Sequence, residues 1–237
     1  MKKLFLCLIL LVFALGTNGQ NDGFINEGDL NIKTKGAFLK LHGENIKNAK
    51  AFLEQNGVKG SPYMMEEFVD GYVVTNNNFK YVDIPLRYNI YNDNIEFQRD
   101  DEILAFNNPS DYRVIAIGNH IFIYSEYASS NSNKSTYFEV LNNNKKLLLL
   151  KRYGMELINP VASKGYVEAK PAEFKQNPVR YYLKVDGMPA QEIGNLNTTF
   201  LLFGDKKSAI EDLIKMEKLK LRKQSDLLRI VDFYNAM

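Results

Sequence analysis

Apolar and polar residues alternate with a period of two along most of the chain between Tyr63 and Ile158. Successive side chains of a β-strand point to opposite faces, so this period predicts strands with one apolar and one polar face. Short turns rich in Asn and Gly separate the strands, and such short connections force neighbouring strands to run antiparallel. The pattern predicts a meander of about seven to nine strands, over residues 72–75, 79–84, 86–91, 94–98, 102–106, 112–117, 120–127, 136–141 and 145–153.

Three of these segments are apolar on both faces: RVIAIG, HIFIY and the run Leu147–Leu150. Strands of this kind lie inside a packed structure, where both faces are covered. A meander of this length has to curl, close into a barrel or fold onto a second layer to protect its edges. We therefore predict an α+β, mainly β fold, built on an antiparallel meander that forms a curled sheet or a partial barrel.

The stretch RYNIYNDNIEF, residues 87–97, has the pattern of a β-hairpin. A two-residue turn at Asn92-Asp93 would place Tyr91 opposite Asn94 and Arg87 opposite Gln98. One face of this hairpin is then apolar and the other polar, which is typical of an antiparallel pair with one solvated side. The apolar face carries Leu86, Tyr88, Ile90, Ile95 and Phe97, and the polar face carries Arg87, Asn89, Tyr91, Asn94, Glu96 and Gln98.

The polar face of this hairpin holds the candidate binding residues Arg87, Asn89, Tyr91 and Glu96. Arg87 and Glu96 can meet diagonally there, with Tyr91 nearby. A plain solvated face explains the same residues without a ligand, and it is the simpler interpretation. On either interpretation, replacing Arg87 and Tyr91 by Ala should leave the fold intact.

The C-terminal part of the chain predicts a second hairpin followed by about three short helices. The hairpin lies in VRYYLKVDGMPAQEI, with Asp186-Gly187 as its turn. Asn197 or Thr198, then Asp205, then Ser225 are the candidate N-caps of the helices. The predicted organisation is a leader (1–19), an N-terminal segment with a weak helix at Glu44–Gly57 (20–60), an antiparallel β-domain (61–160), and a hairpin with a helical tail (161–237), in which residues 160–178 form a connector.

The first residues, MKKLFLCLILLVFALGTNGQ, have the layout of a secretory signal peptide, with two lysines before a short apolar run. Cleavage after Gly19 or Gly16 would remove the only cysteine, Cys7, so that no disulfide can form. The chain has 30 Lys plus Arg and 28 Asp plus Glu. Loss of Lys2 and Lys3 leaves 28 of each, so no global charge attracts nucleic acid. We expect a secreted protein, periplasmic or extracellular, with no transmembrane segment after cleavage.

Few residues carry recognisable chemistry. The two histidines, His42 and His120, are 78 positions apart, which disfavours a His-based metal site. No cofactor motif occurs, and no Gly-x-Ser-x-Gly. Adjacent acids at Glu66-Glu67 and Asp100-Asp101 would support hydrolysis only if the fold brought two together. The basic cluster Lys215, Lys218, Lys220, Arg222 and Lys223 is more typical of a solvated helix face than of a site for acidic groups.

The chain from Gly60 onward resembles a family of secreted proteins of unknown function from Gram-negative bacteria. The stretches that carry the resemblance are GSPYMMEEFVDGYV, IPLRYNIYNDNIEF, KKLLLLKRYG and YYLKVDG, followed by a C-terminal tail of the type shared by many such envelope proteins. The resemblance implies export and a place in the cell envelope. It implies no activity, cofactor or catalytic residue.

These observations predict a non-enzymatic module of the envelope that binds a ligand or another envelope protein. The alternative is a β-barrel-like carrier that holds a small apolar ligand in its interior. A filled core favours the first hypothesis and an empty apolar lumen the second. A hydrolase that uses scattered acids is the third.

Overall fold

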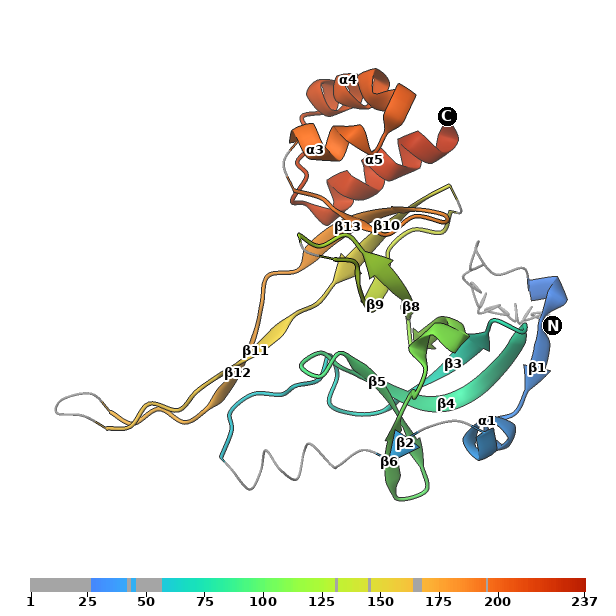
Figure 1. Cartoon of the computed structure of the whole chain (residues 1–237), viewed down its shortest axis with the longest axis vertical. Helices are drawn as coiled ribbons and strands as arrows, with labels where there is room; N and C mark the ends of the chain where they lie inside the picture. The colour runs from blue at the N-terminus through green and yellow to red at the C-terminus, as the bar shows by residue number, and fades with distance from the viewer. Residues whose placement is uncertain are drawn as a thin grey trace, which may run out of the picture.

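The computed structural model describes residues 27–41, 44–45, 57–130, 132–144, 146–163, 168–194 and 196–237. The predicted leader, Cys7 and His42 lie outside them. The described part is mainly β: a curled antiparallel sheet forms a half-barrel, and short helices follow near the C-terminus, as predicted (Figure 1). None of the described helices is both long enough and apolar enough to span a membrane.

One 12-stranded sheet contains most of the described strands, in the order β14-β13-β10-β9-β8-β7-β3-β4-β5-β6-β2, with β1 attached to β4. Each predicted strand overlaps an observed one, and β3 to β6 and β7 to β10 each form an antiparallel run of consecutive strands, as predicted. The two runs do not continue as one meander, because β7 pairs with β3 and not with β6. Their bounds are β3 Val69–Thr75, β4 Phe79–Asn89, β5 Asn94–Arg99, β6 Glu102–Ala105, β7 Tyr112–Ile117, β8 His120–Tyr127, β9 Lys134–Val140 and β10 Leu147–Arg152.

The two strands predicted over residues 79–91 are one continuous strand, β4, which is 11 residues long. Asp83 in its middle has a positive φ of 57°, and the register between β3 and β4 shifts between Gly71 and Val73. A Cβ on Gly71 would lie 2.0 Å from the carbonyl oxygen of Ala116 in β7, so only glycine fits there. This bulge lets the sheet bend without a break in the strand.

The segment predicted to be loose over residues 20–35 contains regular structure at its end. The strand β1 (Asn31–Lys33) pairs in parallel with β4, and the helix α1 (Lys35–Leu41) follows it. Phe38 of α1 is fully buried, with its ring 5.0 Å from that of Phe97. The helix predicted at Glu44–Gly57 is wrong at its start, where Glu44–Asn45 form β2 beside β6. Residues 46–56 lie outside the described residues.

Part of the predicted connector over residues 160–178 belongs to a separate two-stranded ribbon. Strand β11 (Met155–Ile158) pairs with β12 (Glu173–Gln176). The ribbon projects from the body of the sheet (Figure 1).

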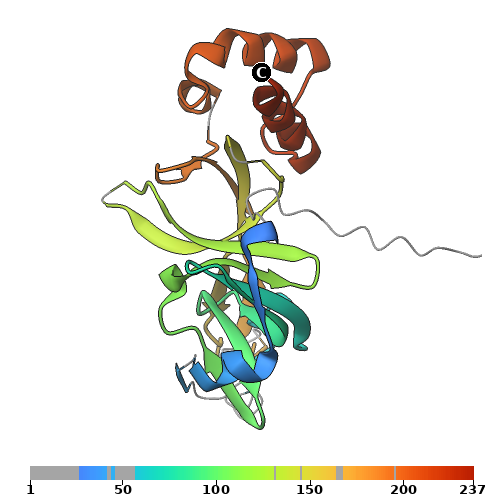
Figure 2. The same cartoon turned by 90° about the vertical axis from the view of Figure 1, so that its right-hand side faces the viewer.

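The C-terminal hairpin extends the sheet, and the helices after it pack against one face of the sheet at its β10–β13 end (Figure 2). The predicted hairpin is present as β13 (Arg180–Val185) and β14 (Gln191–Glu192), with Gly187 at φ 72°. The helices are α3 (Leu196–Leu201), α4 (Lys207–Glu217) and α5 (Gln224–Ala236). Leu147, Leu149 and Leu183 of the sheet pack against Leu227, Ile230 and Val231 of α5.

The capping residues predicted for α4 and α5 are wrong. Lys206 and Lys223 occupy the N-cap positions, and neither makes a side-chain capping hydrogen bond. The helix α5 is tied to the sheet by Asn235, whose buried amide accepts a hydrogen bond from the backbone N–H of Leu147 and donates one to its carbonyl, both at 3.0 Å. This tertiary contact, and not a local capping hydrogen bond, therefore holds the helix against the sheet.

Candidate functional site

The middle of the polar face of the β4–β5 hairpin is not solvated, which contradicts the sequence-based prediction. The exposed fractions of Arg87, Asn89 and Glu96 are 4%, 0% and 1%. The apolar face is buried as predicted. The pairing also differs by two residues, because a four-residue loop joins Asn89 to Asn94 and places Arg87 directly opposite Glu96. A two-residue shift leaves each side chain on its predicted face, and only the cover over the polar face was missed.

That cover comes from the segment 61–68, which runs antiparallel beside the end of β4 at Tyr63 and places the rings of Tyr63 and Phe68 over Arg87. The backbone N–H of Ile90 donates to the carbonyl of Pro62 at 2.8 Å, and the N–H of Met64 donates to the carbonyl of Tyr88 at 2.9 Å. The predicted boundary between residues 60 and 61 does not show that the residues after it would lie on a polar face.

Arg87 is fully engaged beneath this segment. Its Nε donates to Glu96 Oε2 at 2.8 Å, and its two terminal nitrogens donate to the Tyr63 hydroxyl at 2.8 Å and to the Glu66 carbonyl at 3.2 Å. The guanidinium carbon lies 3.8 Å from the ring centre of Tyr63 and 4.3 Å from that of Phe68. A buried charge with every partner in place acts as a structural group.

The other members of this cluster are equally committed. Asn89 donates to the second oxygen of Glu96 at 3.0 Å and accepts from the backbone N–H of Asn92 at 3.0 Å. Burial, with the negative charge of Glu96 and against that of Arg87, raises the pKa of Tyr63 to about 12, so its hydroxyl stays a donor and acceptor at neutral pH. Replacing Arg87 should therefore destabilise the fold, contrary to the prediction from sequence.

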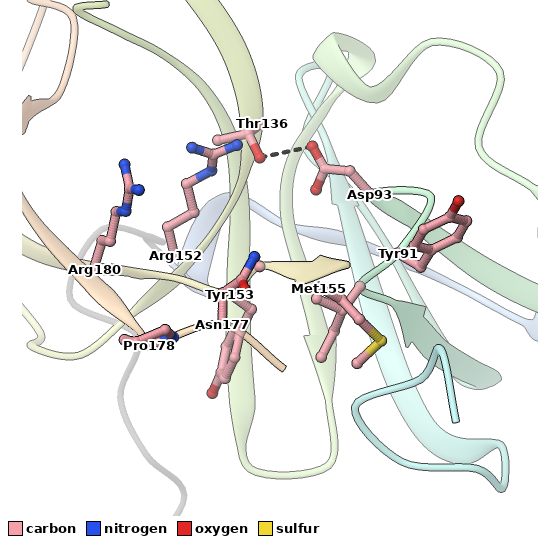
Figure 3. A pocket seen from close by; sticks show the side chains of 11 residues that line it. Tyr91, Asp93, Thr136, Arg152, Tyr153, Met155, Asn177, Pro178 and Arg180 are labelled. Carbon is pink, nitrogen blue, oxygen red and sulfur yellow. Dashed lines mark hydrogen bonds between the residues drawn. The ribbon is translucent and has the colours of Figure 1, made fainter. Parts of the chain in front are cut away.

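Tyr91 is the one predicted binding residue that remains exposed, at 43% of its surface. Its ring lies 5.0 Å from that of Phe174 on the ribbon. It lines a pocket of about 320 Å³ between the tip of the β4–β5 hairpin, the ends of β9, β10 and β13, and the base of the ribbon (Figure 3). The lining residues are Ile90, Tyr91, Asp93, Thr136, Arg152, Tyr153, Gly154, Met155, Asn177, Pro178 and Arg180.

Asp93 joins the hairpin tip to the far side of the curled sheet at this pocket. Its Oδ2 accepts from the Thr136 hydroxyl at 2.6 Å, as drawn in Figure 3, and its Oδ1 accepts from the Tyr88 hydroxyl at 2.7 Å. Burial raises the pKa of Asp93, although these hydrogen bonds and the positive charge of Arg152 oppose the shift. Because its two oxygens accept from Thr136 of β9 and Tyr88 of β4, Asp93 links the two sides of the curled sheet.

Two arginines stand opposite each other on the other wall of the pocket. Arg152 ends β10 and Arg180 begins β13, and their Cα atoms are directly paired across the two strands. Figure 3 shows both side chains extending in the same direction. Arg152 hydrogen-bonds to Tyr182 and lies 4.8 Å from the ring centre of Tyr127, but its buried Nε has no partner in the described part of the chain.

A second polar cluster adjoins the pocket through Tyr153, whose hydroxyl donates to Glu139 Oε2 at 2.6 Å. The Nδ1 of His120 lies 2.5 Å from the other oxygen of Glu139, and Lys151 Nζ lies 3.3 Å from Oε2. Burial acts to raise the pKa of Glu139, but the hydrogen bonds from Tyr153 and His120 and the charge of Lys151 outweigh it and hold the pKa below its usual value. The Glu139 carboxylate is held by Tyr153, His120 and Lys151. Because His120 is one of these partners, it has a structural role in this cluster.

The remaining candidates from sequence stay on the surface. Glu66-Glu67 and Asp100-Asp101 are exposed and do not line the pocket. The basic cluster of Lys215, Lys218, Lys220, Arg222 and Lys223 is exposed around the end of α4 and the turn into α5. Across the described residues, no group of three His, Cys, Asp or Glu side chains is placed to hold a metal ion.

Sequence reasoning found Tyr91 and assigned Asp93 to a turn, but missed Thr136, Arg152 and Arg180. The arginines come together only because β10 pairs with β13, some 30 residues further along the chain. The fold and the pocket thus describe a mainly β protein with a small polar pocket where its curled sheet closes. Comparison of the chain with protein-family models, with curated proteins and with solved structures finds no match in any of the three.

Proposed function

We propose that this chain is exported to the cell envelope and acts there as a binding module whose ligand site is the pocket at the closure of the curled sheet. The observation that carries the proposal is the pocket itself. Four segments far apart in the sequence meet around it, and its walls mix charged, amide and aromatic side chains. Small-ligand sites are typically concave pockets with a volume of a few hundred Å³ and a few well-placed polar groups.

The filled interior of the half-barrel supports the hypothesis of a binding module over that of an apolar carrier. Aromatic rings fill the concave side of the sheet in contact with one another, with Tyr88 and Phe122 5.2 Å apart and Phe106 and Tyr112 4.6 Å apart. Phe38 of α1 closes this cluster from the side of β4, where it is fully buried. An apolar ligand in the interior would have to displace these rings.

The N-terminal pattern of two lysines, an apolar run and small residues supports export. The resemblance of the chain from Gly60 onward to secreted Gram-negative envelope proteins supports the same location.

The test is to purify the protein from its native host and identify by mass spectrometry the small molecules that it retains. Gly154→Phe provides the matched control, because a Cβ on Gly154 meets only the side chain of Asn177, at 3.5 Å, and a larger side chain would fill the pocket. We expect a polar small molecule that the wild type retains and Gly154→Phe does not. A lipid retained equally by both proteins would favour the apolar carrier. If neither protein retains a small molecule, the proposal is contradicted.

A further inference from the structure

We propose that the pocket binds a small organic acid, with its carboxylate or phosphate group held by Arg152 and Arg180 and its carbon skeleton lying against Tyr91, Met155 and Pro178. This inference rests on the proposed function and names the class of ligand.

The first argument is the direct pairing of two like charges. Arg152 and Arg180 are opposite each other on neighbouring strands, and like charges in that position destabilise a sheet unless a counter-charge lies between them. The guanidinium group cannot relieve the repulsion by losing its proton, because its pKa is far above neutral pH. A bound anion is the natural counter-charge.

The second argument is that the nearby carboxylates do not fill this role. Asp93 faces the arginines across the pocket and its charge acts on Arg152. Its two oxygens are nevertheless held by Thr136 and Tyr88, burial raises its pKa, and no ion pair joins it to either arginine within the described residues. Glu192 lies 3.6 Å from Arg180 on the exposed side, where 61% of the Arg180 side chain and 44% of the Glu192 side chain are open to solvent. An exposed pair of this kind contributes little and is easily displaced.

The third argument is the unused hydrogen-bonding capacity of Arg152. A guanidinium has five N–H donors in a fixed planar fork, which matches the two oxygens of a carboxylate or a phosphate. Tyr182 uses part of this capacity, and the buried Nε has no partner in the described part of the chain, so the Arg152 side chain has to move for this donor to reach a ligand in the pocket. Buried donors of this kind are rare, because leaving one unpaired is costly.

The remaining walls indicate that the acid is organic. The exposed ring of Tyr91, the thioether of Met155 and the ring of Pro178 form apolar surfaces beside the arginines, and the Asn177 amide adds a neutral polar group. A volume of about 320 Å³ is at the lower end of the range for small-molecule sites. It suits an acid with a short aromatic or aliphatic body.

The experiment is isothermal titration calorimetry on the purified protein in a chloride buffer, with phenylacetate, phenyl phosphate and the neutral phenylacetamide as probes. We expect at least one acid to bind about tenfold or more tightly than the amide, because a charge-assisted bidentate contact is worth more than 1.4 kcal/mol, the equivalent of that factor. The better of the two acids identifies the anionic group.

Arg152→Gln and Arg180→Gln should each weaken binding of the better acid about tenfold or more. The matched control is Arg99→Gln, which removes an exposed arginine of β5 that pairs with Glu102 and does not line the pocket. It should leave affinity unchanged. Arg180 is exposed, so its variant should fold normally, and its unfolding midpoint checks this.

Equal affinities for the acids and the amide, or full affinity in both pocket arginine variants, would overturn the inference. If Gly154→Phe then abolishes binding of all three probes, the pocket binds neutral ligands and the proposed function stands. If no probe binds more tightly to the wild type than to Gly154→Phe, the inference also fails, and retention of native small molecules decides the proposed function separately.

Discussion

Arg87 and Arg152 are two arginines on strands of one sheet with opposite surroundings. Arg87 is almost fully buried, and Glu96, Tyr63 and Glu66 accept its hydrogen bonds. Arg152 is half-buried, stands opposite Arg180 and keeps a buried nitrogen without a partner among the described residues. From the sequence alone, Arg87 was a candidate binding residue and Arg152 was not. The structure places Arg87 in a buried hydrogen-bonded cluster, and we propose the binding role for Arg152.

The difference shows that residue type alone does not separate a structural arginine from a binding one. What separates them is how completely the surrounding chain satisfies the guanidinium. A buried guanidinium whose N–H donors all have acceptors stabilises the fold only while those partners remain. A guanidinium with unpaired donors can instead serve a ligand. Four variants test this contrast.

Arg87→Met should produce the largest effect, a loss of about 3–5 kcal/mol in the free energy of unfolding, because it leaves Glu96 buried without its counter-charge. Chemical denaturation measures this. The double variant Arg87→Met with Glu96→Gln should recover part of the loss, since it removes the unpaired charge. A loss below that of Arg99→Met, the exposed control, would show that the buried cluster is not structural.

Glu139→Gln should lower stability by about 1.5–3 kcal/mol at neutral pH, because it removes the charged acceptor of Tyr153 and His120. The pKa of Glu139 is depressed in the folded protein. Its contribution is therefore present above the usual pKa of a glutamate and is lost as pH falls through the folded value. Denaturation curves over a pH series should converge for wild type and variant in acid, and a constant difference at all pH values would contradict this role.

Asp93→Asn should change the pH dependence in the opposite sense. Burial raises the pKa of Asp93 in the folded protein, so the folded state binds the proton more tightly than the unfolded state does. The contribution of this group to stability therefore rises as pH falls through the folded pKa. Relative to wild type, the variant should lose this acid-side gain, and the same pH series measures it. A variant that loses stability mainly at neutral pH would show that the charged carboxylate is the stabilising form.

Arg180→Gln should have the smallest effect on stability, within about 0.5 kcal/mol of wild type, because the side chain is exposed and its loss relieves a like-charge pair. Thermal unfolding provides the measurement, in the absence of added anions. A large loss would assign Arg180 to the structural group beside Arg87 and would remove half of the proposed anion site.

The period-two pattern and the turn residues were enough to predict the antiparallel strands, the apolar face of the hairpin and the Asp186-Gly187 turn, because each depends on neighbours in sequence. They did not predict that β7 pairs with β3 and not with β6. The pattern could not show that segment 61–68 would cover the polar face of that hairpin. Nor could it pair Arg152 with Arg180. Both contacts join segments whose meeting depends on how the whole sheet curls, and no local propensity encodes that.

The most direct test of the contrast is to follow the side-chain Nε–H resonances of the arginines by ¹H–¹⁵N nuclear magnetic resonance while the better of the two acid probes is added. We expect Arg87 to give a resonance protected from solvent exchange that does not move. The resonance of Arg152 should shift in proportion to the bound fraction. Movement of Arg87 with a stationary Arg152 would contradict both the structural role of the first arginine and the binding role of the second.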